Sequence, residues 1–142
     1  MKVQSILAAK GPRVVSVGLD ATVAEAVSTL AAHNVGVVVV VDADNHPIGI
    51  LSERDIIRSL SDGPEFLRRS VADVMTRGVV TGTPDDDIEA VLHAMTSRHF
   101  RHMPIVEQGV LVGLVTLGDL VKAQLNDARG AVESLETQVM AR

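Results

Sequence analysis

The sequence predicts an α/β (α+β) protein built from two β-α-β-β-α repeats that pack together into one module. Three observations lead to this prediction. The chain of 142 residues matches itself when it is shifted by 65 positions. Each copy contains short β-branched runs and amphipathic stretches with helical spacing. Hydrophobic residues make up 46% of the chain and aromatic residues only 1%, which suits aliphatic strands covered by amphipathic helices.

The internal repeat holds its register over almost the whole chain. A shift of 65 superposes Val15 on Val80 and Val40 on Ile105, and a shift of 64 after the turn superposes Asp55 on Asp119. A repeat of about 60 residues buries its sheet more easily against a second repeat than alone. We therefore expect repeat 1 at residues 1–62, repeat 2 at residues 63–126 and a C-terminal helix at residues 127–142.

The first repeat is expected to begin with a β-branched strand at residues 13–17. Thr22 and Glu25 have the spacing of a capping box, and apolar residues then follow helical spacing as far as His33. The Val-rich run at residues 36–41 is far shorter than the roughly 20 residues that span a bilayer. This run is therefore expected to be a strand buried on both faces.

The rest of the first repeat and the whole second repeat follow the same order. A polar turn at residues 42–46 joins the buried strand to a strand at residues 47–52, which a helix at residues 53–60 follows. Residues 61–64 contain Gly-Pro and separate the repeats. The second repeat is expected to have its elements at residues 78–81, 87–98, 102–107, 110–116 and 117–124.

The end of the chain places Val132, Leu135 and Val139 at helical spacing. We expect a helix that continues from the second repeat and rests on the body or on a partner subunit. A dedicated target-binding tail is the alternative.

Composition excludes several functions. The net charge of −5, from 18 acidic and 13 basic residues, argues against general nucleic-acid binding. Without Trp or Tyr there is no aromatic platform for stacked bases, and without Cys there is no disulfide, thiolate zinc site or cysteine nucleophile. The N-terminus lacks the apolar core of a signal peptide. We expect a cytoplasmic protein with neither nucleic acid nor membrane as a partner.

Two matched tetrads stand where a strand is followed by a helix: Ser52-Glu53-Arg54-Asp55 and Thr116-Leu117-Gly118-Asp119. One interpretation is that each merely caps its helix. The other is a ligand site, because a hydroxyl at a helix N-terminus can donate to a phosphate and a short carboxylate can accept both hydroxyls of a ribose. The same tetrad at the same place in both repeats favours the ligand site.

Each tetrad follows a glycine and two apolar residues, as in Gly49-Ile50-Leu51 and Gly113-Leu114-Val115. This doubled pattern resembles the CBS-domain family, named after cystathionine β-synthase, and covers roughly residues 3–124. The stand-alone length resembles small bacterial CBS-pair proteins, also called Bateman modules. The resemblance implies two clefts related by a pseudo-twofold axis, and a regulatory adenine nucleotide (AMP, ADP, ATP or NAD(H)) as ligand. It implies no required cofactor and no catalysis.

In the family, the tetrad of one repeat holds ribose and phosphate, and strands of the other repeat hold adenine. Carried over to this sequence, the resemblance assigns to one cleft Thr116, Asp119, Arg101, His102, Val15, Val35 and Gly36. It assigns to the other cleft Ser52, Asp55, Arg54, Ile50, Val79, Val80 and Phe100. Arg101 and His102 bring phosphate-binding groups to the first cleft, which is expected to be the better site. Arg101 is also expected to crowd adenine in the second cleft, and Arg54 has an alternative as a solvated side chain.

No metal site or catalytic set is expected. His99 and His102 have poor geometry for shared ligation because His102 opens a predicted strand. The acidic run at residues 85–87 lies at a predicted helix start, where acids complement the helix dipole.

Three function classes remain: an adenine-nucleotide sensor, a ligand-independent scaffold for protein interaction or dimerisation, and, weakest, an enzyme. The family resemblance further implies a homodimer, with an unidentified protein target.

Overall fold

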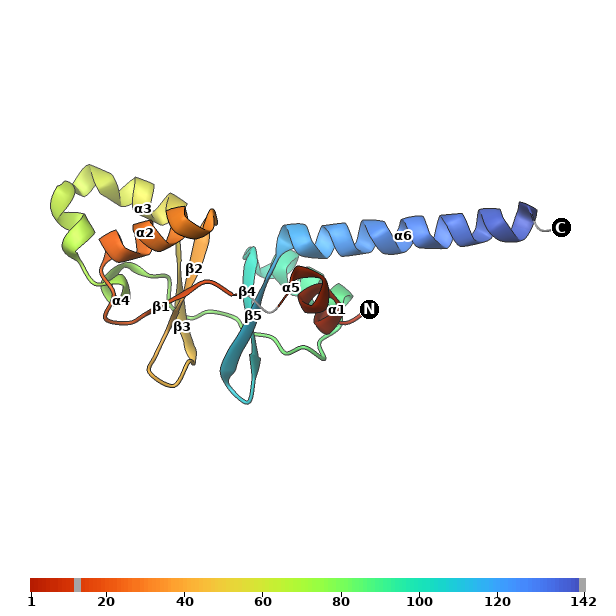
Figure 1. Ribbon diagram of the computed structural model, residues 1–142, viewed down its shortest axis with the longest axis horizontal. Helices are drawn as coiled ribbons and strands as arrows, with labels where there is room; N and C mark the ends of the chain where they lie inside the picture. The colour runs from red at the N-terminus through yellow and green to blue at the C-terminus, as the bar shows by residue number, and fades with distance from the viewer. Residues whose placement is uncertain (12–13, 141–142) are drawn as a thin grey trace.

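The computed structural model describes residues 1–11 and 14–140 of the protein, and it contains two lobes and a long projecting helix (Figure 1). The first lobe holds a three-stranded sheet with the order β1-β2-β3, formed by Ser16–Gly18, Val37–Val41 and Pro47–Ser52. Strand β1 runs parallel to β2, and β2 runs antiparallel to β3. The second lobe holds a two-stranded antiparallel sheet of β4 (His102–Glu107) and β5 (Val110–Thr116).

Helices α2 (Val23–His33) and α5 (Ile88–Arg98) are the matched helices of the two repeats. The predicted capping box of α2 is present, because Thr22 and Glu25 each accept the other's backbone N–H. Both helices end at a residue with left-handed backbone, Asn34 (φ 52°) and His99 (φ 58°). These two residues are 65 positions apart, so the duplication extends to the helix ends.

The predicted strand at residues 78–81 is wrong. Residues 78–81 do not pair, and Gly82 directly after them makes a single parallel bridge with Ile105, in which the Gly82 N–H donates to Pro104 at 3.0 Å and the Gly82 carbonyl accepts from Val106 at 2.8 Å. A turn ends the pairing there, because the Thr83 N–H donates to the Asp86 carboxylate at 2.9 Å. The bridge nevertheless keeps the register of β1, where Val17 lies opposite Val40.

The predicted first strand is displaced in the chain. Strand β1 begins at Ser16, and the Val15 carbonyl before it still accepts a hydrogen bond from Val39 at 3.2 Å. Arg13, where the strand was predicted to begin, lies outside the described residues.

The segments that precede the two repeats are exchanged between the lobes. Helix α1 (Val3–Lys10) buries Val3 and Ile6 in the hydrophobic core of the second lobe. Helix α4 (Val71–Val74) buries Val71 in the core of the first lobe, together with Phe66 from the 3₁₀ turn η2 (Pro64–Arg68). Each core is therefore completed by the segment that leads into the other repeat. The boundaries at residues 62 and 126 stay a prediction.

A small apolar cluster and two hydrogen bonds join the two lobes near the hairpin turn of the first repeat. Val39, Val41 and Leu111 form a buried cluster between the sheets. The Leu111 N–H donates to the Asn45 carbonyl at 2.9 Å, and the Asn45 side-chain amide donates to the Leu111 carbonyl at 3.3 Å. The hairpin turn of the first repeat thus fixes its position against the second sheet.

The first lobe closes with α3 (Glu53–Ser59), which the short 3₁₀ turn η1 (Leu60–Asp62) follows. In the second lobe the matching helix is α6 (Leu117–Met140), a single helix of 24 residues. Beyond the body α6 extends alone, as Figure 1 shows. The prediction that the helix continues from the second repeat is confirmed. The prediction that the C-terminal part of this helix packs on the body is wrong, because Val132, Leu135 and Val139 are 54, 62 and 70% exposed.

Within the described part of the chain, no helix combines the length and the apolar character that crossing a membrane requires.

Candidate ligand site

A cavity of about 730 Å³ lies between the two repeats. It is bounded by the strand-to-helix junctions of both repeats and by the connecting segment at residues 76–80. Apart from Asp119, the residues assigned to the two clefts all line this cavity: Val15, Val35, Gly36, Ile50, Ser52, Arg54, Asp55, Val79, Val80, Phe100, Arg101, His102 and Thr116. The two predicted clefts thus form one continuous space.

The first tetrad lines this cavity, and its serine and aspartate are hydrogen-bonded to each other as a helix cap. Ser52 and Asp55 form a capping box, in which the Asp55 N–H donates to Ser52 Oγ at 3.2 Å. The Ser52 hydroxyl donates to Asp55 Oδ2 at 2.8 Å, and the Ser52 N–H donates to the same oxygen at 3.3 Å. Both residues are half-buried and line the cavity. Helix capping fixes the carboxylate in place at the cavity wall.

The second tetrad has the same cap and one additional partner. The Thr116 N–H donates to Asp119 Oδ2 at 2.9 Å, and the Asp119 N–H donates to Thr116 Oγ1 at 3.1 Å. Lys10 Nζ also lies 2.7 Å from Asp119 Oδ2 and donates to the Leu114 carbonyl at 2.9 Å. Lys10 lines the cavity and Asp119 does not. The carboxylate is therefore engaged by a lysine from the far end of the chain.

Sequence analysis missed Lys10 because its two partners are 104 and 109 residues away. It ends α1, and Gly11 follows with φ 87°, a conformation that favours glycine. Nothing in the sequence around Lys10 indicates where its side chain points. The other cavity-lining residues that were not predicted are Val14, Val37, Glu53, Thr76, Arg77, Gly78 and Leu114.

The charges at the second-repeat end of the cavity are mainly cationic. Burial lowers the pKa of His102 below its ordinary value, and the positive charges of Arg101 and Lys10 lower it further, against an opposing effect of Asp119. Burial raises the pKa of Asp119, but hydrogen bonds from Lys10 and Thr116 and the lysine charge outweigh it, so the net shift is downward. An anion placed here would meet Lys10 and Arg101.

A second cavity of about 680 Å³ adjoins the first and shares Arg101, His102 and Thr116 with it. It continues along one face of α6, where Lys122 and Arg129 add two cations and Val121 and Leu125 add apolar surface.

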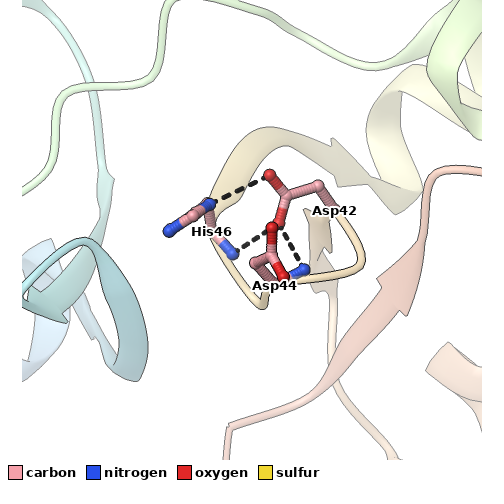
Figure 2. Close-up of side chains that lie close together, drawn as sticks. All are labelled: Asp42, Asp44 and His46. Atoms are coloured by element: carbon pink, nitrogen blue, oxygen red, sulfur yellow. Dashed lines mark hydrogen bonds and ion pairs between the residues drawn. The ribbon is translucent and has the colours of Figure 1, made fainter.

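The turn at residues 42–46 gathers Asp42, Asp44 and His46, whose ligating atoms all lie within 4.8 Å of one another (Figure 2). The Asp42 carboxylate accepts the N–H groups of Asp44 at 3.0 Å and His46 at 2.9 Å and lies 3.0 Å from His46 Nδ1. The hydrogen bond from the His46 backbone N–H is the main cause that lowers the pKa of Asp42. These contacts explain the cluster as the structure of a tight turn, and we assign no metal to it.

Comparison with known proteins identifies the family. A model of the CBS domain matches residues 9–62 and 71–126. The crystal structure of a CBS-domain protein from Agrobacterium tumefaciens is 40% identical, with a TM-score of 0.79 over 87% of this chain and 99% of that one. The Bacillus subtilis CBS domain-containing protein YhcV is 36% identical over 84% of this chain and 85% of its own length.

A CBS domain protein from Pyrobaculum aerophilum, solved in complex with AMP, is 27% identical, with a TM-score of 0.74 over 84% of this chain and 89% of that one. The chain spans 65% and 61% of the lengths of two further relatives, from Acidianus ambivalens and Arabidopsis thaliana. The internal repeat, the paired tetrads and these matches lead to one conclusion: the chain belongs to the CBS domain family and carries two CBS repeats.

Proposed function

We propose that this chain is a non-catalytic regulatory module that binds an adenine nucleotide in the cavity between its repeats. The observation that carries the proposal is that one cavity collects both an apolar wall and a polar, largely cationic end. Val15, Val35 and Val80 belong to the wall, which suits a purine base. Lys10, Arg54 and Arg101 supply charge for phosphate oxygens.

Within this cavity we assign the ribose to Asp55. Its carboxylate lines the cavity and is held by Ser52, whereas the Asp119 carboxylate lies behind the Lys10 ammonium. The sequence favoured the cleft of Thr116 and Asp119, and the geometry moves our preference to the cleft of Ser52 and Asp55. In this proposal Asp119 acts by positioning Lys10 for the phosphate.

The AMP complex of the Pyrobaculum aerophilum relative supports the choice of ligand class. AMP, ADP, ATP and NAD(H) all share the adenosine phosphate that this cavity would accept.

The second candidate function is a ligand-independent scaffold. It is favoured by the complete capping boxes of both tetrads, which give Ser52, Asp55, Thr116 and Asp119 a structural role without any ligand. We keep it as the alternative.

Thermal unfolding with and without nucleotide separates the two functions. A ligand at 100 times its Kd that binds only the folded state stabilises the protein by about 2.7 kcal/mol, which corresponds to a rise in Tm of roughly 5–11 °C for a domain near 150 residues. We expect such a rise with AMP or ATP and none with the matching guanosine nucleotides. Identical melting with and without every adenine nucleotide would favour the scaffold.

Nucleotide affinity should rise as the pH falls from 8 toward the pKa of free His102, which burial and neighbouring positive charges hold below its ordinary value. A bound phosphate favours the imidazolium, so the His102 pKa is higher in the complex and binding takes up a proton. Affinity would change by up to about tenfold per pH unit for one proton. Calorimetry from pH 8 to 6 measures this change, and His102→Gln should flatten the profile. An equally steep profile in the variant would assign the proton uptake to another group.

We further propose a cytoplasmic homodimer that acts on an unidentified protein target. Ile57 on α3 and Val121 on α6 are exposed apolar residues at matched positions of the two repeats, which supports an interface that uses this position of both lobes. Light scattering should therefore give the mass of a dimer at tens of micromolar protein.

A further inference from the structure

The projecting part of α6 carries an apolar seam. Its apolar positions are separated by four, three, four, three and four residues, which is the a/d pattern of a heptad repeat. These seam residues, all exposed in the structure, are Val121, Leu125, Ala128, Val132, Leu135 and Val139. At about 1.5 Å per residue, a helix of 24 residues is roughly 36 Å long. The first turns of α6 pack on the second lobe through Leu117, Leu120 and Ala123, and a regular exposed seam on the rest of the helix indicates a helical partner.

The flanking charges indicate which partner fits. With Val132 at an a position, the flanking e positions are Lys122, Arg129 and Glu136. The seam is therefore basic toward the body and acidic toward the end of the helix. A second copy that runs in the opposite direction brings the acidic end of one helix to the basic end of the other. The seam is thus complementary to itself.

We infer that α6 pairs with α6 of a second copy as a short antiparallel coiled coil. In the register we assign, Val132 packs against the partner's Leu135 and Ala128 against the partner's Val139. Arg129 then lies beside the partner's Glu136, and the twofold symmetry forms this ion pair twice. The inference goes beyond nucleotide binding and gives the proposed homodimer a second contact surface, so it rests on that part of the proposed function.

Other arrangements satisfy the charges less well. A parallel pair would place Arg129 beside the partner's Gln124 and Glu136 beside the partner's Ala131, with no ion pair. An antiparallel pair shifted by one heptad would place the two Arg129 side chains opposite each other. Like charges at flanking positions disfavour a coiled coil. The assigned register avoids such a contact.

Disulfide trapping tests the orientation and the register, because the chain contains no cysteine. We expect mild oxidation of a mixture of A128C and V139C chains to give a disulfide-linked dimer. Each variant alone should remain unlinked, and so should T137C on the outer face of the helix. A128C linking to itself would show a parallel pair, and a mixture that gives no link would exclude the proposed contact. Either outcome overturns the inference.

Exchanging the charges at positions 129 and 136 tests whether the partner is a second α6, and it leaves the folded lobes intact. R129E and E136K, each added to both cysteine variants, should reduce the yield of the disulfide about three- to tenfold, because each creates two like-charge contacts. Mixing R129E/A128C chains with E136K/V139C chains should restore it, since both pairs are then of opposite charge. Failure to restore the yield contradicts the inference.

Sedimentation of the wild-type protein separates the two dimer proposals. A monomer mass would refute both the homodimer and the coiled coil, and would leave the seam to another protein or a membrane surface. A dimer mass without the disulfide between positions 128 and 139 would refute only the coiled coil. Neither result bears on nucleotide binding, which the thermal shift measures independently.

Discussion

Replacing Asp55 with alanine is expected to weaken AMP binding about 10- to 150-fold. Losing a hydrogen bond to a charged group costs about 1.5–3 kcal/mol, which corresponds to that range of affinity. Asp55 is the tetrad carboxylate that both lines the cavity and lies free of Lys10. Isothermal titration of the variant and the wild-type protein with AMP measures the difference.

Two further variants separate ligand contact from helix capping. Asp55→Asn keeps a side-chain oxygen for the cap and should unfold close to the wild-type temperature, yet it should bind AMP more weakly because the charge is lost. Asp119→Ala frees Lys10 from its ion pair, so its effect should depend on the phosphate and be small for adenosine. If Asp55→Asn bound AMP as well as the wild type, Asp55 would be a helix cap alone.

Replacing Gly49 with alanine is expected to lower the free energy of unfolding by about 1–3 kcal/mol, the usual effect of overpacking. A Cβ atom at Gly49 would lie 2.5 Å from Met75 Sδ and 2.8 Å from the Thr76 carbonyl oxygen. Ile50 and Thr76 exchange two backbone hydrogen bonds beside it, at 2.9 and 3.1 Å. The segment from Thr76 to Val80 lines the cavity, so ligand affinity should fall as well. Urea unfolding measures the stability.

The other glycines provide matched controls. The three atoms nearest to a Cβ atom at Gly113, the duplicate of Gly49, all belong to the Leu7 side chain, whose end can move. A Cβ atom at Gly18 would meet nothing within 4 Å. Gly18→Ala should therefore change stability by less than about 0.5 kcal/mol, with Gly113→Ala between the two. If Gly18→Ala and Gly49→Ala lowered the free energy of unfolding equally, the close packing of Gly49 against Met75 and Thr76 would not be what holds residues 76–80 in place.

The sequence predicted the helices and their caps correctly where the internal repeat and short-range capping motifs indicate the same element. The shift of 65 predicted matched helices, and the structure places their left-handed ends at Asn34 and His99. The capping box of Thr22 and Glu25 was readable because both partners lie within one helical turn. The predicted strand at residues 78–81 was wrong because pairing begins only at Gly82, where the Thr83–Asp86 turn limits it to one bridge.

Long-range contacts were not predictable from spacing. The exchange of α1 and α4 between the lobes places Val3 in the second core and Val71 in the first, and nothing in a helical pattern indicates which core a helix joins. Lys10 reaches Asp119 only because of this exchange. The same exchange explains why the structure and the sequence favour different tetrads as the ribose site.

Titration of the wild-type protein with AMP, ADP, ATP and NAD(H) in a calorimeter tests whether the cavity binds an adenine nucleotide. We expect saturable heat with at least one of these nucleotides, weakened by Asp55→Asn, and no heat with GMP or GTP as controls. No heat with any adenine nucleotide, from a protein that unfolds cooperatively, would contradict the assignment of the cavity and leave the two tetrads as helix caps.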